Sequence, residues 1–301
     1  MGAVKRGKRM SLEREEAIKG VLFISPWIIG FLVFTLYPFI SSFYYSFTRF
    51  GGIGTPVFIG LKNYVNLFHD KLFYLSLYNT LYYTVIAVPL GVVLGIAVAL
   101  LLNQKIRGLS FFRTIIYMPY MVPTVASAIL WMWILDPQFG LINSLLASIG
   151  IKGPGWLADP AWSKMSLIIM AQWGMGQAVV IYLSGLRNVP TELYESADID
   201  GANIFQKFFH VTLPMMSPVI LYNVILGVIN SLQYFTQAYI MTSGGPVNST
   251  LFYSLYLFRE SFMNYHMGYA SAMAWILLVI IAACVYLLFK TSAKYVYYSG
   301  E

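Results

Sequence analysis

Carboxylates concentrate in one short polar stretch of a chain that has few charged residues elsewhere. Glu192, Glu195, Asp198 and Asp200 are four of the 12 acidic residues, and they lie between two long apolar segments. The three histidines are scattered along the chain and give no metal-ligand spacing, so the carboxylates do not predict a metal site or an enzyme. Two interpretations of this stretch remain open: an ordinary acidic surface loop, or a surface that binds a partner.

Local chemistry predicts a helix, a turn and a second helix in this stretch. Residues 191–199 lack Gly and Pro, Gly201 gives the backbone the freedom to bend, and we expect Pro214 to end the second helix. Three aromatic residues at i, i+3, i+4 predict an apolar face on that second helix: Phe205, Phe208 and Phe209. A short hairpin cannot form its own core, so this face needs neighbouring helix ends or a partner to pack on.

Polar and small residues recur at helical spacing in two apolar segments. The first stripe comprises Met170, Trp173, Gly174 and Gln177. The second comprises Gly227, Asn230, Ser231 and Tyr234, with Gln233 beside it. An amide inside a membrane is unfavourable unless it is hydrogen-bonded, so both stripes should face the protein interior or a wet cavity. Either contact with a polar solute or packing between helices, where small residues are common, explains them.

The composition identifies an integral membrane protein. Of 301 residues, 58% are hydrophobic and 10% are charged, whereas soluble domains carry about 25% charged residues. A membrane-spanning helix needs about 20 mostly apolar residues. Six segments qualify: 21–45, 78–102, 114–135, 165–186, 215–240 and 269–289. None of them contains Asp, Glu, Lys or Arg.

The positions of the basic residues predict the orientation in the membrane. The net charge of +7 does not indicate nucleic-acid binding, because basic residues crowd the N-terminus and flank the apolar segments. With the N-terminus inside, 13 of the 19 Lys and Arg residues lie on the cytoplasmic side. That excess favours cytoplasmic N- and C-termini. The acidic stretch then faces the cytoplasm as well.

The acidic stretch resembles the coupling loop, or EAA loop, of permease subunits in binding-protein-dependent ABC importers. The family pattern Glu-x-Ala-x-x-Asp-Gly-Ala, then Phe and Leu-Pro, falls on Glu195, Ala197, Asp200, Gly201, Ala202, Phe209 (or Phe208), Leu213 and Pro214. Ser196 stands where the family usually has Ala, a change between small residues. The resemblance implies that this loop docks on a separate ATP-hydrolysing subunit.

Further motifs extend the resemblance over residues 20–290, toward the "first" permease subunits of maltose-, lactose- and multiple-sugar-type importers. They are Phe58–Tyr64, Arg107–Arg113 with Pro119 and Trp131, Phe139–Asn143, and Thr242–Thr250. The implied fold is an all-α integral membrane protein: a six-transmembrane-helix, type I ABC-importer permease with a cytoplasmic coupling-helix hairpin. The expected division is a basic cytoplasmic tail (1–19), the first transmembrane helix and external loop (20–74), a core permease domain (75–290) that includes the coupling loop (187–214), and a cytoplasmic tail (291–301).

The same resemblance implies the function and the partners. We expect a sugar-importer permease in a bacterial or archaeal cell membrane that pairs with a second homologous permease, two ATP-binding subunits and an external solute-binding protein. Maltose-type permeases line their sugar site near the two polar stripes, so these become candidate sugar contacts. Coupling to the ATPase falls on Glu195 to Pro214, including the three phenylalanines.

The sequence also bears on whether the chain binds a cofactor, is driven by an ion gradient, or carries an anionic solute. No cofactor is expected on this chain, because residues 2–9 only approximate a phosphate-binding loop and lack its hydroxyl residue; ATP and Mg²⁺ belong on the partner ATPase. An ion-coupled secondary carrier usually places ionisable groups at bilayer depth, and these segments have none. Glycerol phosphate or another anionic solute remains open, although it calls for a cation in the pathway.

Overall fold

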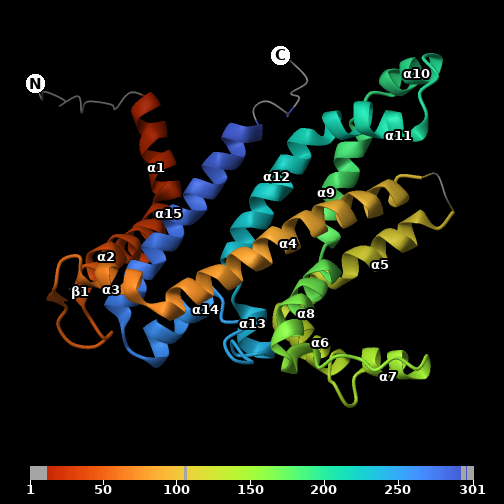
Figure 1. Cartoon of the computed structure of the whole chain (residues 1–301). Helices are drawn as coiled ribbons and strands as arrows, with labels where there is room; N and C mark the ends of the chain where they lie inside the picture. The colour runs from red at the N-terminus through yellow and green to blue at the C-terminus, as the bar shows by residue number, and fades with distance from the viewer. Residues whose placement is uncertain (1–11, 105–106, 293–295, 297–301) are drawn as a thin grey trace, which may run out of the picture.

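The computed structural model describes residues 12–104, 107–292 and 296, and within them the fold is almost entirely helical (Figure 1). Residues 1–11 and most of 293–301, which include much of both expected tails and the near match to a phosphate-binding loop at 2–9, lie outside the described residues. The elements are α1 (Leu12–Phe31), η1 (Leu32–Leu36), α2 (Tyr37–Ser46), β1 (Thr48–Arg49), β2 (Val57–Phe58), α3 (Lys62–His69), α4 (Lys71–Leu102), α5 (Leu109–Met121), α6 (Thr124–Ile134), α7 (Leu141–Ser148), η2 (Trp156–Ala158), α8 (Pro160–Trp173), α9 (Gly176–Arg187), α10 (Thr191–Ile199), α11 (Ile204–Lys207), η3 (Phe208–Thr212), α12 (Leu213–Leu232), α13 (Thr236–Met241), α14 (Tyr253–Phe258), η4 (Arg259–Met263) and α15 (Met267–Ser292).

The six expected membrane segments are mainly helical, but two of them are sharply bent and a third, 215–240, is interrupted between α12 and α13. Among the described residues, four helical stretches are long and apolar enough to cross a bilayer: Glu16–Ser46, Lys71–Leu102, Ile204–Met241 and Met267–Ser292. Two further helix pairs qualify if each bent pair counts as one span. The expected architecture of six spans is confirmed with this modification.

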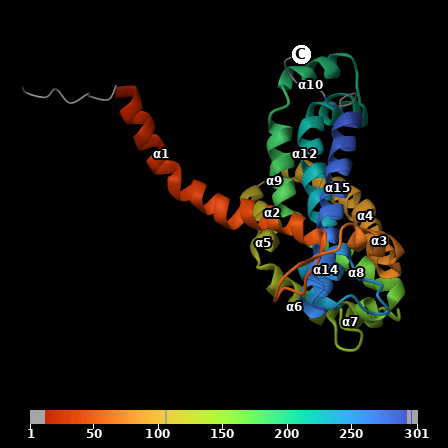
Figure 2. The ribbon, with the colours of Figure 1, turned by 90° about the vertical axis from the view of Figure 1, so that its left-hand side faces the viewer.

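The first span stands apart from the other helices. Its first helix, α1, begins at Leu12, inside the segment expected to be a tail, and projects away from the rest of the molecule (Figure 2). Its apolar side chains are exposed; Phe23, for example, is 87% exposed. The C-terminal part, α2, packs on α15, where the rings of Phe39 and Phe43 each lie 4.8 Å from that of Trp275. The exposed face of α1 suits lipid or another membrane helix.

Two prolines follow π-helical turns inside long helices without ending them, and one of them, Pro214, was expected to end its helix. Pro38 and Pro214 each follow a π-helical turn, Leu32–Leu36 and Phe208–Thr212 respectively. Proline lacks an amide hydrogen and crowds the carbonyl four residues earlier. A wider π turn at that place relieves the crowding, because the hydrogen bonding shifts by one residue. The helix that leaves the hairpin therefore continues into α12.

The third and fourth expected spans are bent, and this overturns the continuous helices expected at 114–135 and 165–186. The axes of α5 and α6 meet at 99°, and those of α8 and α9 meet at 50°. Val122 precedes Pro123 and is extended (φ −71°, ψ 129°), as steric contact with a following proline favours. The second break lies at Gly174, which caps α8.

The fifth expected span, 215–240, is interrupted as well. Helix α12 ends at Leu232, and Gln233 to Phe235 form a break before α13. Beyond α13, the Thr242–Thr250 segment folds against α4, because Asn79 donates hydrogen bonds to the carbonyls of Asn248 (2.9 Å) and Leu251 (3.1 Å). The three breaks thus lie within expected spans rather than at their ends.

The two ends of the helix bundle carry different structures. The α10–α11 hairpin lies at the same end as the start of α1 and the end of α15 (Figure 1). The β1–β2 pair, α3 and α7 lie toward the opposite end. There Asp70 caps α4 and accepts hydrogen bonds from the hydroxyls of Tyr256 and Tyr269, which ties α4 to α14 and α15. The polar hairpin and the cavity described next are therefore separated along the bundle.

Candidate functional site

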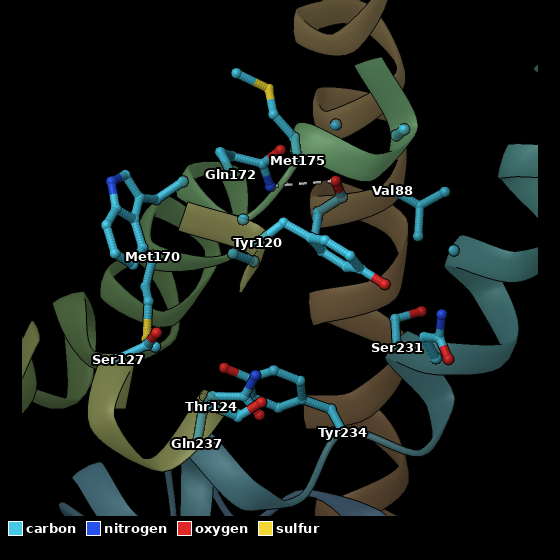
Figure 3. A pocket seen from close by; sticks show the side chains of 18 of the residues that line it. Val88, Tyr120, Thr124, Ser127, Met170, Gln172, Met175, Ser231, Tyr234 and Gln237 are labelled. Carbon is cyan, nitrogen blue, oxygen red and sulfur yellow. Dashed lines mark hydrogen bonds between the residues drawn. The ribbon is translucent and has the colours of Figure 1, made fainter. Parts of the chain in front are cut away.

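The three helix breaks surround a cavity of about 560 Å³ in the middle of the bundle (Figure 3). Its walls come from α4, from α5 and α6, from α8 and α9, and from α12 and α13. Eight of the nine residues in or beside the two polar stripes line it: Met170, Trp173, Gly174, Gly227, Asn230, Ser231, Gln233 and Tyr234. The two polar stripes, more than 50 residues apart in the sequence, therefore face one space.

Gln177 is the exception. It is exposed and lies outside the cavity lining. The i, i+3, i+4, i+7 spacing assumed one continuous helix from Met170 onward, but the bend after Gly174 changes the direction in which later side chains point. Gln172, which the stripe omitted, lines the cavity instead.

Several polar lining residues were not predicted. Tyr120, Thr124 and Ser127 reach the cavity because the bend between α5 and α6 turns that segment inward (Figure 3). The break after α12 similarly brings in Thr236 and Gln237. The prolines at 119 and 123 and the amide-rich Gln233–Gln237 segment were the available sequence signals, since broken membrane helices often line a cavity.

Stacked aromatic rings form one side of the cavity. The rings of Tyr83 and Tyr234 lie 4.4 Å apart at an interplanar angle of 30°, and Phe252 packs edge-on against both. The Tyr234 hydroxyl is buried and has no hydrogen-bond partner of normal geometry among the described residues. An unpaired buried hydroxyl is unfavourable, so water or a solute hydroxyl would stabilise it.

Other polar groups present acceptors to the cavity. The Gln172 amide nitrogen donates to the carbonyls of Ile168 (3.2 Å) and Ala87 (3.4 Å), the latter bond shown in Figure 3. The Ser231 hydroxyl donates to Val228 (3.0 Å). With their hydrogens used in this way, the amide oxygen of Gln172 and the oxygen of Ser231 remain free to accept. No described lining residue carries a charge, so the cavity suits a neutral solute rich in hydroxyl donors.

The hairpin is built as its residue types require. Gly201 adopts φ +73°, a left-handed conformation that other residues rarely take. The next helix begins with a capping box, in which Asn203 accepts from the Gln206 amide (2.9 Å) and Gln206 accepts from the Asn203 amide (2.8 Å). Lys207 forms an ion pair with Asp198 across the turn at 2.6 Å. The expected helix, turn and helix are confirmed.

The three phenylalanines do not share one environment. Phe208 packs into a core cluster between α4, α9 and α12, together with Tyr194 of α10. Phe205 and Phe209 are 72% and 57% exposed. The single apolar face expected for the second helix is therefore divided, because the π turn beginning at Phe208 changes the helical phase. One ring anchors the hairpin and two remain open to a partner.

Some of the remaining expected coupling residues line a groove on the hairpin, and the others lie outside it. Ala197, Asp200, Gly201 and Ala202 line a groove of about 490 Å³ on the hairpin. Glu195 is exposed outside that groove and forms no ion pair with a described residue. Pro214 lies in the helix that leads away toward the cavity. The hairpin thus offers a concave surface, an unpaired carboxylate and two exposed rings.

A continuous set of packed side chains joins the hairpin to the cavity. Tyr194 binds Thr212 through their hydroxyls (2.9 Å), which fixes α10 to the helix entering α12. Phe208 packs into the cluster that contains the fully buried Tyr182. Tyr182 also lines the cavity. Packing contacts therefore run from the hairpin to the cavity wall.

Comparison with known proteins identifies related chains. Residues 91–297 match the family described as "Binding-protein-dependent transport system inner membrane component". The chain is 40% identical to the "Probable ABC transporter permease protein YesP" of Bacillus subtilis, over 96% of this chain and 94% of that protein. It is 37% identical to the "Lactose transport system permease protein LacF" of Rhizobium radiobacter, over 95% and 98%. A chain in the crystal structure of a "bacterial alginate ABC transporter in complex with alginate pentasaccharide-bound periplasmic protein" is similar, with TM-score 0.81 and 25% identity over 94% of this chain and 96% of that one.

Proposed function

This chain belongs to the family of binding-protein-dependent transport system inner membrane components, and on that premise we propose that it is a permease subunit of an ATP-driven carbohydrate importer. The observation that carries the proposal is the central cavity, which has stacked aromatic rings, free acceptors and no charged lining residue. Relatives named for lactose and alginate transport support a carbohydrate as the solute. The cavity would form this subunit's half of the pathway.

The assembly we propose contains four further components. A second, homologous permease completes the pathway, and two ATP-binding subunits bind ATP and Mg²⁺. An external solute-binding protein delivers the sugar; the alginate transporter structure with its loaded periplasmic protein supports this element. This chain itself performs no hydrolysis in the proposal.

The hairpin is proposed to face the cytoplasm and to dock on an ATP-binding subunit. Its end of the bundle also holds the basic residues that begin α1 and finish α9 and α15, namely Arg14, Arg187 and Lys290. Basic residues near span ends favour the cytoplasmic side. Glu195 would pair with a basic residue of the ATPase, and Phe205 and Phe209 would become buried on docking.

The proposed mechanism follows from differences in contacts between two states. ATP binding draws the two ATPase subunits together and moves the docked hairpins with them. Through Phe208, Tyr194 and the α12 helix, that movement tilts the cavity walls and exposes the cavity to the loaded binding protein. Hydrolysis releases the hairpins, and the cavity then opens inward.

The direct test is uptake by the assembled transporter in proteoliposomes. Uptake should require ATP on the side of the membrane where the hairpin lies. It should also require the binding protein. Tyr234→Ala should reduce uptake while the subunits still assemble. Uptake driven by an ion gradient without ATPase subunits would overturn the proposal in favour of a secondary carrier.

A different cargo for the same machinery is the second candidate. A phosphorylated or acidic solute would need a cationic group in the pathway, and the described cavity lining of this chain provides none. The partner permease could supply one. Competition of labelled sugar uptake by neutral and by anionic sugars separates the two cases.

A further inference from the structure

A second, smaller cavity lies near the hairpin end of the bundle, between α4, α5 and α9. It measures about 280 Å³ and shares no lining residue with the central cavity. Its lining combines two arginines, Arg113 and Arg187, with the hydroxyl residues Tyr117 and Ser184 and with apolar side chains. Neither the proposed transport pathway nor the hairpin uses it.

The geometry of two helices explains the space. At Gly176 the backbones of α5 and α9 approach so closely that a Cβ there would lie 2.6 Å from the Ile116 carbonyl oxygen. Farther toward the hairpin end the helices leave a gap, with Arg113 on one wall and Arg187, the last residue of α9, on the other. The two arginines therefore lie directly at the ends of the apolar segments 114–135 and 165–186.

The arginines have unused hydrogen-bonding capacity. One terminal nitrogen of Arg113 donates to the carbonyl of Leu102 (3.1 Å), but its Nε atom is buried and has no partner among the described residues. Arg187 is exposed. Neither residue forms an ion pair with any described residue, and no acidic side chain lines the cavity. Two cations without counter-ions beside an unpaired buried donor favour an anion, which guanidinium groups bind with directed hydrogen bonds.

We propose that this cavity binds the phosphodiester group of an anionic membrane lipid. The position near the ends of the apolar segments matches the level of lipid headgroups, and basic pockets between membrane helices on the cytoplasmic side bind such groups. Val180 at the cavity and Ile115 on the neighbouring turn of α5 are exposed apolar side chains that would meet acyl chains. Ser184 and Tyr117 supply hydroxyl donors to the phosphate oxygens. The assignment to the cytoplasmic leaflet rests on the proposed orientation; the site itself does not.

The test measures lipid binding to the assembled transporter in neutral detergent. Phosphatidylglycerol is titrated and bound lipid is counted by native mass spectrometry, with phosphatidylcholine as the uncharged comparison. Losing one charge-assisted contact in Arg187→Gln should weaken phosphatidylglycerol binding about tenfold. Arg107→Gln is the matched control, because Arg107 is an exposed arginine at the same end that does not line the cavity. Equal binding by wild type and Arg187→Gln would overturn the proposal.

Two further arms identify the occupant. Inorganic phosphate added in excess should not displace the lipid; full displacement would reassign the cavity to a free anion. A photo-crosslinking benzoylphenylalanine substituted for Val180, whose exposed side chain would meet the acyl chains, should label phosphatidylglycerol in vesicles. Exclusive crosslinking to the partner permease would show that protein covers the cavity and would also overturn the proposal. Neither arm depends on the transported solute.

Discussion

The central cavity and the α10–α11 hairpin differ in almost every physical respect. The cavity is lined by broken helices and has no charged lining residue. The hairpin is exposed and rich in carboxylates, of which only Asp198 forms an ion pair within the described part of the chain, with Lys207. The cavity can recognise a solute without the large desolvation penalty of a buried ion. The hairpin can recognise a second protein because charges at its surface stay hydrated until docking. In the proposed function, solute handling and energy supply therefore occupy separate parts of one chain.

A change in the hairpin turn should have the largest effect. Gly201→Val places a β-branched side chain at φ +73°, which costs about 1–2 kcal/mol and distorts the turn. We expect ATP-dependent uptake to fall by about tenfold or more in proteoliposomes. Ser196→Ala is the control, since it leaves the turn unaltered and should transport normally. Normal uptake by Gly201→Val would remove the turn from the coupling account.

A change in the cavity should affect solute handling alone. Tyr234→Ala removes the ring stacked on Tyr83 and its buried hydroxyl, and we expect about tenfold lower uptake. Stimulation of ATP hydrolysis by the binding protein should persist, because the hairpin is intact. Gln177→Ala provides the matched control: it lies outside the cavity lining and should transport nearly as wild type. If the two variants behave alike, the cavity does not define the pathway.

Truncation of an exposed aromatic side chain in the hairpin should weaken docking moderately. Phe205→Ser removes a ring that is 72% exposed in this chain and that would be buried against the ATPase. The affinity for the ATPase subunit should fall about tenfold or less, measured by co-purification at decreasing concentration. Phe139→Ser, which alters an exposed ring in the segment before α7 at the opposite end, should leave that affinity unchanged.

The smallest effect is expected from the ion pair across the hairpin. Asp198→Asn removes the charge opposite Lys207, but Asp198 is exposed and Lys207 is partly exposed, so the loss of stability should be about 0.2–1 kcal/mol. Uptake should change by less than about threefold. A large loss would mean that Asp198 contacts the ATPase directly.

Residue type and spacing predicted the parts of the site that depend on local chemistry. Gly201 has the positive φ that a tight bend needs, and the Gly227, Asn230, Ser231 and Tyr234 stripe lies on a continuous part of α12 and its end. Each of these signals operates within one or two helical turns. Spacing alone was sufficient there.

The errors have one physical cause, which is that apolar composition does not reveal where a membrane helix bends. Gln177 was placed on the wrong side of a break, and Pro214 was expected to end a helix that continues through a π turn. Inside a bundle, neighbouring helices and cavities satisfy the freed backbone groups. The bend is therefore decided by packing between segments distant in the sequence.

The most direct test of the account compares two variants of the reconstituted transporter, Glu195→Lys and Tyr234→Ala. For each variant, the number of sugars imported per ATP hydrolysed is measured. Glu195→Lys should lose both uptake and the ATP hydrolysis that the binding protein stimulates, because the ATP-binding subunit no longer docks on the hairpin. Tyr234→Ala should keep the stimulated hydrolysis and lose uptake, so that fewer sugars enter per ATP. A wild-type ratio and rate in both variants would contradict the assignment of energy supply to the hairpin and of solute handling to the cavity.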